Sequence, residues 1–186
     1  MANHVHHIAV PEGEDSLAKA IRAAHGDYSK YFNTKYGLVG HVWQGRFNSF
    51  PMDWDYCRNA VRYVERNPVR AGLVVNAEDY LWSSAAAHSG LRDDPLLCGG
   101  CPLLEEVADW SEWLRDAENE KANEKIRRHT RTGRPLGPKT FLVRLEEETG
   151  RKLLPQKRGP RLKASPIENK AERKEQEPRH LPKLFG

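Results

Sequence analysis

Apolar residues recur at helical spacing in two segments of the chain. From Ser16 to Gly37 their period of three to four predicts an amphipathic helix, with Ser16 as its N-cap and Gly37 as its end. A second helix follows Asp53, which can cap it, and ends at the Asn67-Pro68 step, because the residue before a proline is disfavoured in the α conformation. Residues 103–129 predict one further, strongly charged helix.

Two other stretches favour β-strands. Residues 4–10 read as a strand, and residues 38–52 read as one or two short strands around Gly40 and Gly45. Strands that alternate with helices in this order predict an α+β domain with helices packed on an antiparallel sheet. The sheet would be thin, since two or three strands lie at the lower limit of independent stability.

Composition narrows the class of protein. No segment approaches the run of about 20 apolar residues that spans a bilayer, and the N-terminus has no apolar signal segment. The three cysteines cannot form an even disulfide set, which is typical of a reducing compartment. We therefore expect a cytoplasmic protein without a membrane partner.

Charge is distributed unevenly along the chain. Residues 1–114 carry 10 Lys and Arg against 15 Asp and Glu, whereas residues 115–186 carry 20 against 11. This asymmetry predicts a basic arm that meets a polyanion. A solvated tail without a partner is the alternative.

Four side chains suggest a reaction. His4 and His6 would lie on one face of a strand, about 6 to 7 Å apart along the backbone, as a pair of metal ligands. Tyr63 and Asn67 are four residues apart and share a helical face. A tyrosine can attack a phosphodiester, and a divalent ion held by both imidazoles and the Asn67 oxygen would assist it. Such mixed nitrogen and oxygen ligands suit Mg²⁺ or Mn²⁺. The alternative is that Tyr63 packs the helix and Asn67 caps it.

Cys98 and Cys101 have the CxxC spacing of many zinc ligands. The chain has no second CxxC pair to complete such a site. A structural zinc protein that uses these cysteines together with histidines is therefore a further, weaker hypothesis.

Several segments resemble a known family. The stretch "NHVHHIAVP" looks like the His-hydrophobe-His motif of the HUH single-strand transposases. "GHVWQGRFNSF" and "YCRNAVRYVERNPVRAGLV" are similar to the REP-associated tyrosine transposases of bacteria, as are "WSSAAAH" and "TRTGRPLGPKTFLVRLEEETGRKLLPQKRGPR". The resemblance covers residues 2–162, and its most specific parts are "RYVERNPVRAG" and "TRTGRPLG".

The resemblance implies a function and a fold. Tyr63 takes the place of the family's nucleophile, and His4, His6 and Asn67 take the places of its metal ligands. Such enzymes cut single-stranded DNA at REP hairpins by transesterification, leaving a 5′-phosphotyrosine and a free 3′-hydroxyl. Family members have an opening strand, helix and second strand before the histidine motif, so we expect a truncated ferredoxin-like HUH domain. A relic that binds REP hairpins without cutting them is the alternative.

The expected organisation is a catalytic domain at 1–114, a basic DNA-binding arm at 115–163 and a disordered tail at 164–186, in a monomer. Aromatic side chains can stack on unpaired bases, and arginines can bind phosphate or guanine. Trp43 could instead belong to the core. The candidate DNA contacts are Trp43, Gln44, Arg46, Arg66, Arg70, Arg127, Arg128, Arg131, Arg134 and Lys139.

Overall fold

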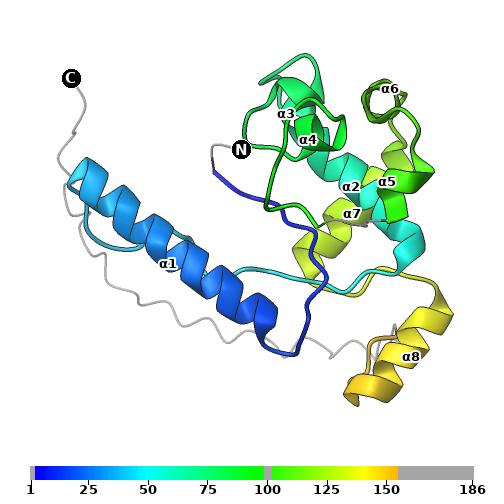
Figure 1. The fold of residues 1–186 in the computed structure, drawn as a ribbon. Coiled ribbons are helices and arrows are strands. Elements are labelled where there is room, and N and C mark those ends of the chain that lie inside the picture. Colours follow the sequence, from blue (N-terminus) through cyan, green and yellow to red (C-terminus); the bar gives the residue numbers. More distant parts are fainter. Residues whose placement is uncertain (1–2, 99–101, 155–186) are drawn as a thin grey trace, which may run out of the picture. The chain divides into compact units, whose positions relative to one another are not determined.

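The computed structural model describes residues 3–98 and 102–154, which belong to a single compact unit, Met1–Leu154. Their regular structure is helical (Figure 1). The α-helices are α1 (Ser16–Tyr36), α2 (Trp54–Glu65), α3 (Asn67–Arg70), α4 (Ala85–His88), α5 (Pro102–Glu106), α6 (Trp110–Arg115), α7 (Glu120–Thr132) and α8 (Lys139–Thr149). A 3₁₀ turn, η1, spans Ala77–Asp79.

The predicted α+β, ferredoxin-like fold is wrong for the part of the chain that the structure describes. Its β-type pairing is limited to one isolated parallel bridge between Met52 and Leu136. Residues 4–10 and 38–50 are irregular rather than strands. A strand is stable only where a neighbour pairs with its backbone N–H and C=O groups, and no described segment lies beside residues 4–10 in that way. Apart from the half-buried His6, residues 4–10 are exposed, so water can form hydrogen bonds with their backbone groups in place of a neighbouring strand.

The first two predicted helices are present, but the predicted end of the second at the Asn67-Pro68 step is wrong. α2 (Trp54–Glu65) stops two residues earlier, and Asn67 is itself helical, because Pro68 is accommodated in the first turn of α3. Gly37 ends α1 in the left-handed conformation (φ 63°) and donates its N–H to the Asn33 carbonyl. Asp53 caps α2 by accepting a hydrogen bond from the Asp55 N–H at 3.2 Å. The predicted cap of α1 is displaced by one residue, since Asp15 is the N-cap and Ser16 begins the helix.

The single helix predicted over residues 103–129 is wrong. The segment forms α5, α6 and the larger part of α7. Asp109 accepts a hydrogen bond from the Glu112 N–H at 2.8 Å, and Asn119 accepts one from the Ala122 N–H at 3.1 Å. Each short polar side chain thereby starts a new helix, because it satisfies backbone donors that a continuous helix would have used.

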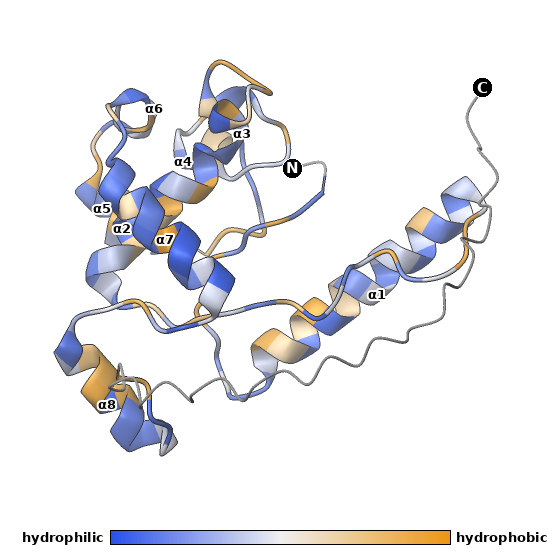
Figure 2. Cartoon of the chain, turned by 180° about the vertical axis from the view of Figure 1, so that it is seen from behind, coloured by the Kyte–Doolittle hydropathy of each residue, from blue (hydrophilic) through white to orange (hydrophobic). Residues whose placement is uncertain are grey.

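An apolar cluster of the described residues joins α2 to α7, which lie side by side in Figure 1. Ala60 and Ile126 meet Leu136 there, and Tyr56 and Tyr63 pack against them. The rest of α7 is hydrophilic, as its mostly blue colour in Figure 2 shows. The predicted boundary between the catalytic domain (1–114) and the basic arm (115–163) falls at Arg115, the last residue of α6. This position lies inside the compact unit Met1–Leu154.

A second apolar cluster is formed by residues of η1, α4, α5 and α6. Its buried members are Ala77, Ala85, Leu103, Trp110 and Leu114, and Val61 of α2 packs against them. α2 therefore contributes to both clusters, which fixes the helix that carries Tyr63.

Among the described residues, no helix combines the length and the apolar character needed to cross a membrane. The predicted disordered tail, 164–186, and the end of the predicted basic arm from residue 155 lie outside the described residues.

Candidate active site

Tyr63 and Asn67 lie on either side of the junction between α2 and α3. α2 ends at Glu65, Arg66 follows in helical conformation, and Asn67 begins α3. Pro68 fits at this point because the first turn of a helix does not need its N–H. The helical path thus continues past the proline, and Asn67 stays one turn beyond Tyr63.

The N-terminal segment brings two histidines to this junction. His4 Nε2 lies 3.2 Å from Asn67 Nδ2. The His4 and His6 rings are 5.0 Å apart between centroids, and the His6 ring is 6.2 Å from that of Tyr63. All four residues predicted as nucleophile and metal ligands are therefore close together.

The hydrogen bonds and the burial of the imidazoles bear on metal binding. His4 Nδ1 lies 2.7 Å from Asn3 Oδ1, and His4 Nε2 faces the Asn67 amide. An Nδ1–H that donates to the Asn3 oxygen would leave the Nε2 lone pair for a metal. The pKa of His6 is lowered by its burial and further by the charges of His4 and Arg70, which favours the neutral imidazole.

The donor set fits Mg²⁺ or Mn²⁺. The set would comprise two imidazole nitrogens and the Asn67 amide oxygen. The amide NH₂ now faces His4 and the oxygen lies 3.5 Å from Arg70 Nη2, so a half-turn of the amide that brings its oxygen to a metal would also give up the contact with Arg70. The described residues contain no group of three His, Cys, Asp or Glu side chains suited to a metal. A site at this junction therefore depends on the amide as its third ligand.

Arg70 connects Tyr63 to Asn67. Its guanidinium lies over the Tyr63 ring, 4.1 Å from the centroid, and donates to the Tyr63 carbonyl oxygen. The same group lies 3.5 Å from Asn67 Oδ1. Positive charge is thus fixed against the ring that a phosphotransfer reaction would use.

Arg62 and Arg66 hold the segment between α6 and α7. Arg62 donates to the Asp116 and Ala117 carbonyls, and Arg66 donates to the Leu114 carbonyl. These acceptors lie at the C-terminal end of α6, where unpaired carbonyls and the helix dipole favour a cation.

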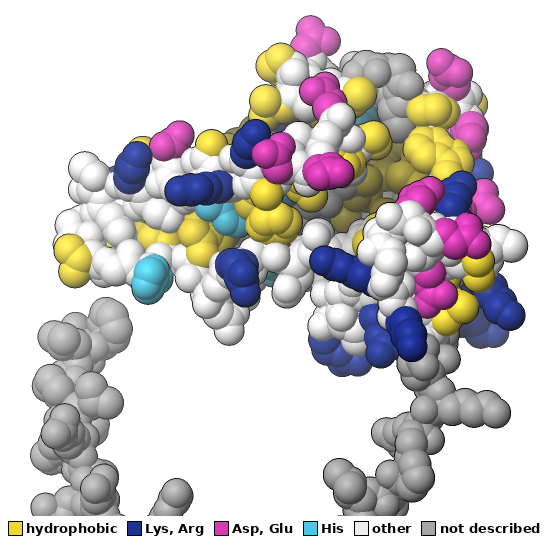
Figure 3. Space-filling view, turned by 90° about the horizontal axis from the view of Figure 1, so that it is seen from below, with side chains coloured by type: hydrophobic (Ala, Val, Ile, Leu, Met, Phe, Trp, Pro, Cys, Tyr) yellow, Lys and Arg dark blue, Asp and Glu magenta, His cyan; other side chains and the backbone are white. Residues whose placement is uncertain are grey.

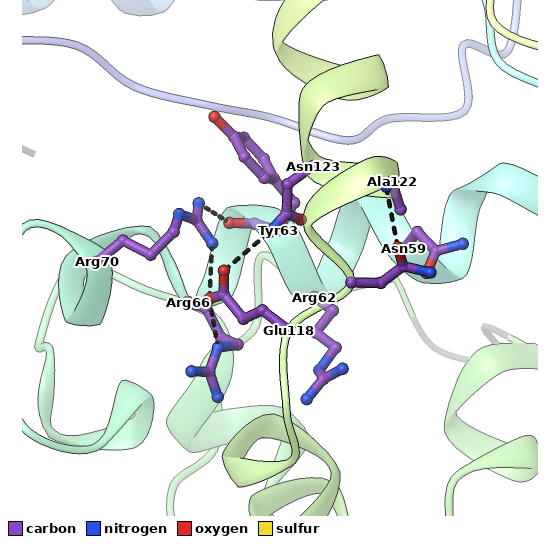
Figure 4. Close-up of a pocket in the computed structure, with 9 residues that line it drawn as sticks. Asn59, Arg62, Tyr63, Arg66, Arg70, Glu118, Ala122 and Asn123 are labelled. Carbon is purple, nitrogen blue, oxygen red and sulfur yellow. Dashed lines mark hydrogen bonds and ion pairs between the residues drawn. The ribbon is translucent and has the colours of Figure 1, made fainter.

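Glu118 neutralises two of the predicted DNA contacts. Figure 4 shows Arg66, Arg70 and Asn123 converging on its carboxylate. Arg66 Nε lies 2.7 Å and Arg70 Nη1 lies 3.3 Å from Glu118 Oε1. The role of both arginines in DNA binding stays a prediction, and it would require phosphate to compete with this carboxylate.

The Glu118 cluster predicts a pH dependence of stability. Burial alone would raise the pKa of Glu118, but the hydrogen bond from Arg66 and the charge of Arg70 outweigh it, so this pKa lies below the ordinary glutamate value of 4.5. A lowered folded pKa contributes stability that is full above the unfolded pKa and is lost as pH falls through the folded value. Urea denaturation of wild type should therefore show a loss of stability below about pH 4.5 that is smaller in Glu118→Gln. Equal losses in both proteins would contradict the pairing.

The remaining predicted DNA contacts differ in exposure. Trp43 is half-buried and stacks on His25, whereas Gln44 and Arg46 are exposed. The pKa of Arg127 is raised by its hydrogen bond to Glu120 and further by an interaction with Tyr63. An exposed basic set lies on α7 and just beyond it: Arg127, Arg128, Arg131, Arg134 and Lys139.

A buried carboxylate near the site was not predicted. Glu65, two residues after Tyr63, is 1% exposed and accepts hydrogen bonds from Ser84 Oγ, His88 Nδ1 and Trp110 Nε1 at 2.5, 2.6 and 2.6 Å. It ties α2, the helix that carries Tyr63, to α4 and α6. Neither Glu65 nor Glu118 stands out in the sequence, since acidic residues are common on solvated helix faces.

The described residues do not add support to the hypothesis of a structural zinc site at Cys98 and Cys101. Cys98 is exposed, and Cys101 lies outside the described residues.

Comparison of the chain with protein-family models, with curated proteins and with solved structures finds no match.

Proposed function

We propose that this chain is a metal-dependent transposase and endonuclease that cuts and rejoins single-stranded DNA at REP hairpins, with Tyr63 as nucleophile. The observation that carries the proposal is the approach of the His4 and His6 imidazoles and the Asn67 amide to Tyr63. A tyrosine that only packs a helix needs no such companions. The four residues are also those that match the family's motifs.

The reaction is a transesterification. The Tyr63 oxygen attacks the scissile phosphorus, so a Tyr63 O–P bond forms as the bond from phosphorus to the 3′-oxygen breaks. The phenol proton passes to water, and the departing 3′-oxygen takes up a proton. Attack by another 3′-hydroxyl reverses the step and rejoins DNA. One phosphodiester replaces another, so no external energy source is needed.

The surrounding residues assist by charge and position. Arg70 lies against the Tyr63 ring, where it stabilises negative charge that develops during attack. His4, His6 and Asn67 would hold Mg²⁺ or Mn²⁺. The ion, when bound, supplies Lewis-acid stabilisation of the scissile phosphate.

A covalent-capture assay tests the proposal. Purified protein is mixed with an end-labelled single-stranded REP hairpin and Mn²⁺ or Mg²⁺, and denaturing gels are run. We expect a covalent protein–DNA band that EDTA removes. The double variant His4→Ala/His6→Ala should lose this band yet still shift the hairpin on a native gel. A hairpin that binds wild type but never becomes covalent with either metal would reject the proposal.

In that case the second candidate, a hairpin-binding protein without cleavage activity, would take its place. It is favoured specifically by the exposed basic residues of α7 and the segment after it, which include Arg128 and Arg131. Basic side chains that bind phosphates release counterions, so the affinity falls with salt.

The salt dependence of hairpin binding measures this charge pairing. Arg128→Ala/Arg131→Ala should reduce the slope of log K against log [salt] by about 0.9 for each phosphate that an arginine no longer neutralises, about 1.8 in all. Arg144→Ala is the matched control, because Arg144 is an exposed arginine on α8 next to Glu148. An unchanged slope in the double variant would place the phosphate-binding residues elsewhere.

A further inference from the structure

Helix α1 carries aromatic side chains that no other described residue buries. None of its residues is buried, although the helix is 21 residues long. Tyr28, Tyr31 and Tyr36 are 45%, 58% and 56% exposed. A helix with this many exposed rings needs an explanation other than packing within the described fold.

The rings of Tyr28, Phe32 and Tyr36 form a continuous row, and Tyr31 is joined to Tyr36 through Lys35. Centroids of Tyr28 and Phe32 are 5.9 Å apart, and those of Phe32 and Tyr36 are 4.7 Å apart. The segment after Gly37 returns along the helix and adds Trp43, which lies 5.5 Å from Tyr28. Trp43 is fixed there because it stacks on His25 at 3.8 Å and donates its indole N–H to the His25 carbonyl.

Positive charge accompanies the rings. Residues 16–50 contain five Lys and Arg against one Asp, a net +4, whereas residues 1–114 as a whole are acidic. Lys35 Nζ lies 5.4 Å from the ring centroids of both Tyr31 and Tyr36 and donates to the Tyr31 hydroxyl at 3.0 Å. Figure 3 shows hydrophobic side chains along this part of the molecule with Lys and Arg beside them.

We propose that α1 and residues 38–47 form a stacking platform for unpaired bases of single-stranded DNA. Aromatic faces accept any base, and neighbouring cations meet the phosphates, which is the combination that single-strand binding uses. An apolar protein partner would not need the net +4 charge or the exposed tyrosine hydroxyls. The platform rests on the proposed function and extends it, since it gives unpaired DNA outside the hairpin a place to bind.

Binding of a labelled oligothymidylate of about 12 nucleotides, within the span of one single-strand module, tests the platform. Fluorescence anisotropy is measured with the full chain in EDTA, so that no cleavage contributes. Tyr31→Ala/Tyr36→Ala should weaken binding at least about tenfold, because two bases then have no ring on which to stack. Tyr31→Phe/Tyr36→Phe keeps the rings and should bind within about twofold of wild type.

Two controls separate stacking from general damage. Alanine favours helix more than tyrosine does, so α1 should persist in the Ala variant, as circular dichroism can verify. Trp82→Ala removes another exposed ring, 80% exposed and outside α1, and should leave the affinity unchanged.

The platform is overturned if wild type does not bind oligothymidylate, if the Ala pair binds as tightly as wild type, or if the Phe pair loses as much affinity as the Ala pair. It is also overturned if sedimentation shows a wild-type dimer that the Ala pair dissociates without any change in DNA affinity, since a second copy then covers α1. Oligothymidylate binding without hairpin cleavage would reject the proposed function alone. Cleavage with unchanged affinity in the Ala pair would reject the platform alone.

Discussion

Tyr63→Phe is expected to abolish the covalent protein–DNA band while hairpin binding stays nearly unchanged. Phenylalanine lacks the oxygen that would bond to phosphorus, so the rate of adduct formation should fall at least about 10³-fold. The ring that packs against Ala60, Ile126 and Leu136 is retained. Arg70 also keeps an aromatic face to lie over. The measurement compares denaturing gels for the adduct with native gels for binding.

Tyr56→Phe is the matched control for this substitution. Tyr56 lies on the same helix and packs against the same cluster as Tyr63, but it has no histidine beside it among the ring contacts of the described residues. Its variant should form the adduct at the wild-type rate. An adduct that persists in Tyr63→Phe and disappears in Tyr56→Phe would reassign the nucleophile. Parallel loss of binding and folding in Tyr63→Phe would leave Tyr63 a packing residue.

The helices that periodicity predicted are those with a strong local signal at one of their ends. α1 ends at Gly37 and α2 begins after Asp53, and both signals act within one turn of the chain. The split of residues 103–129 depends on Asp109 and Asn119, which are equally compatible with a solvated helix face. These residues act as helix caps in a fold that buries Trp110 and Leu114 of α6 in the core, and this burial depends on contacts with distant parts of the chain.

The predicted sheet failed for a different reason. Alternation in residues 4–10 favours a strand, whereas the structure has an irregular segment there. Ladder formation, however, needs a partner strand, and no pattern within a segment reveals whether one is present. His4 nevertheless lies beside Asn67, and the His6 ring lies near that of Tyr63, so the site residues meet although the described residues contain no sheet.

The candidate site was predictable where short spacing sets it. Tyr63 and Asn67 share a face by their separation of four residues. The shared face of His4 and His6 was predicted for a strand, which the described residues do not contain, although the two rings do lie 5.0 Å apart. Glu118 and Glu65 were not predictable, because their partners lie far away in sequence. Arg66 is 52 residues from Glu118, and Trp110 is 45 residues from Glu65.

Removal of the Glu65 carboxylate is expected to have the largest effect on stability. Glu65→Ala would leave Ser84, His88 and Trp110 without their shared acceptor in a site where Glu65 is 1% exposed, and it would also open a cavity. Breaking a buried charged network of this kind costs about 3–5 kcal/mol of the free energy of unfolding. Urea denaturation followed by tryptophan fluorescence measures it, with Trp110 as an internal reporter.

Glu65→Gln separates the effect of the hydrogen bonds from the effect of the side-chain volume. The glutamine amide keeps one acceptor oxygen and has an NH₂ donor in place of the other. This NH₂ would face either the donors of Ser84 and His88 or the donor of Trp110. The mismatch should cost about 1–3 kcal/mol of the free energy of unfolding. Glu124→Ala, an exposed acid on α7, should stay within about 0.5 kcal/mol of wild type. If Glu65→Ala costs no more than Glu124→Ala, the carboxylate does not hold α2 to α4 and α6. If it costs the expected amount, adduct formation should decline with the folded fraction, because Tyr63 is carried by the same helix two residues away.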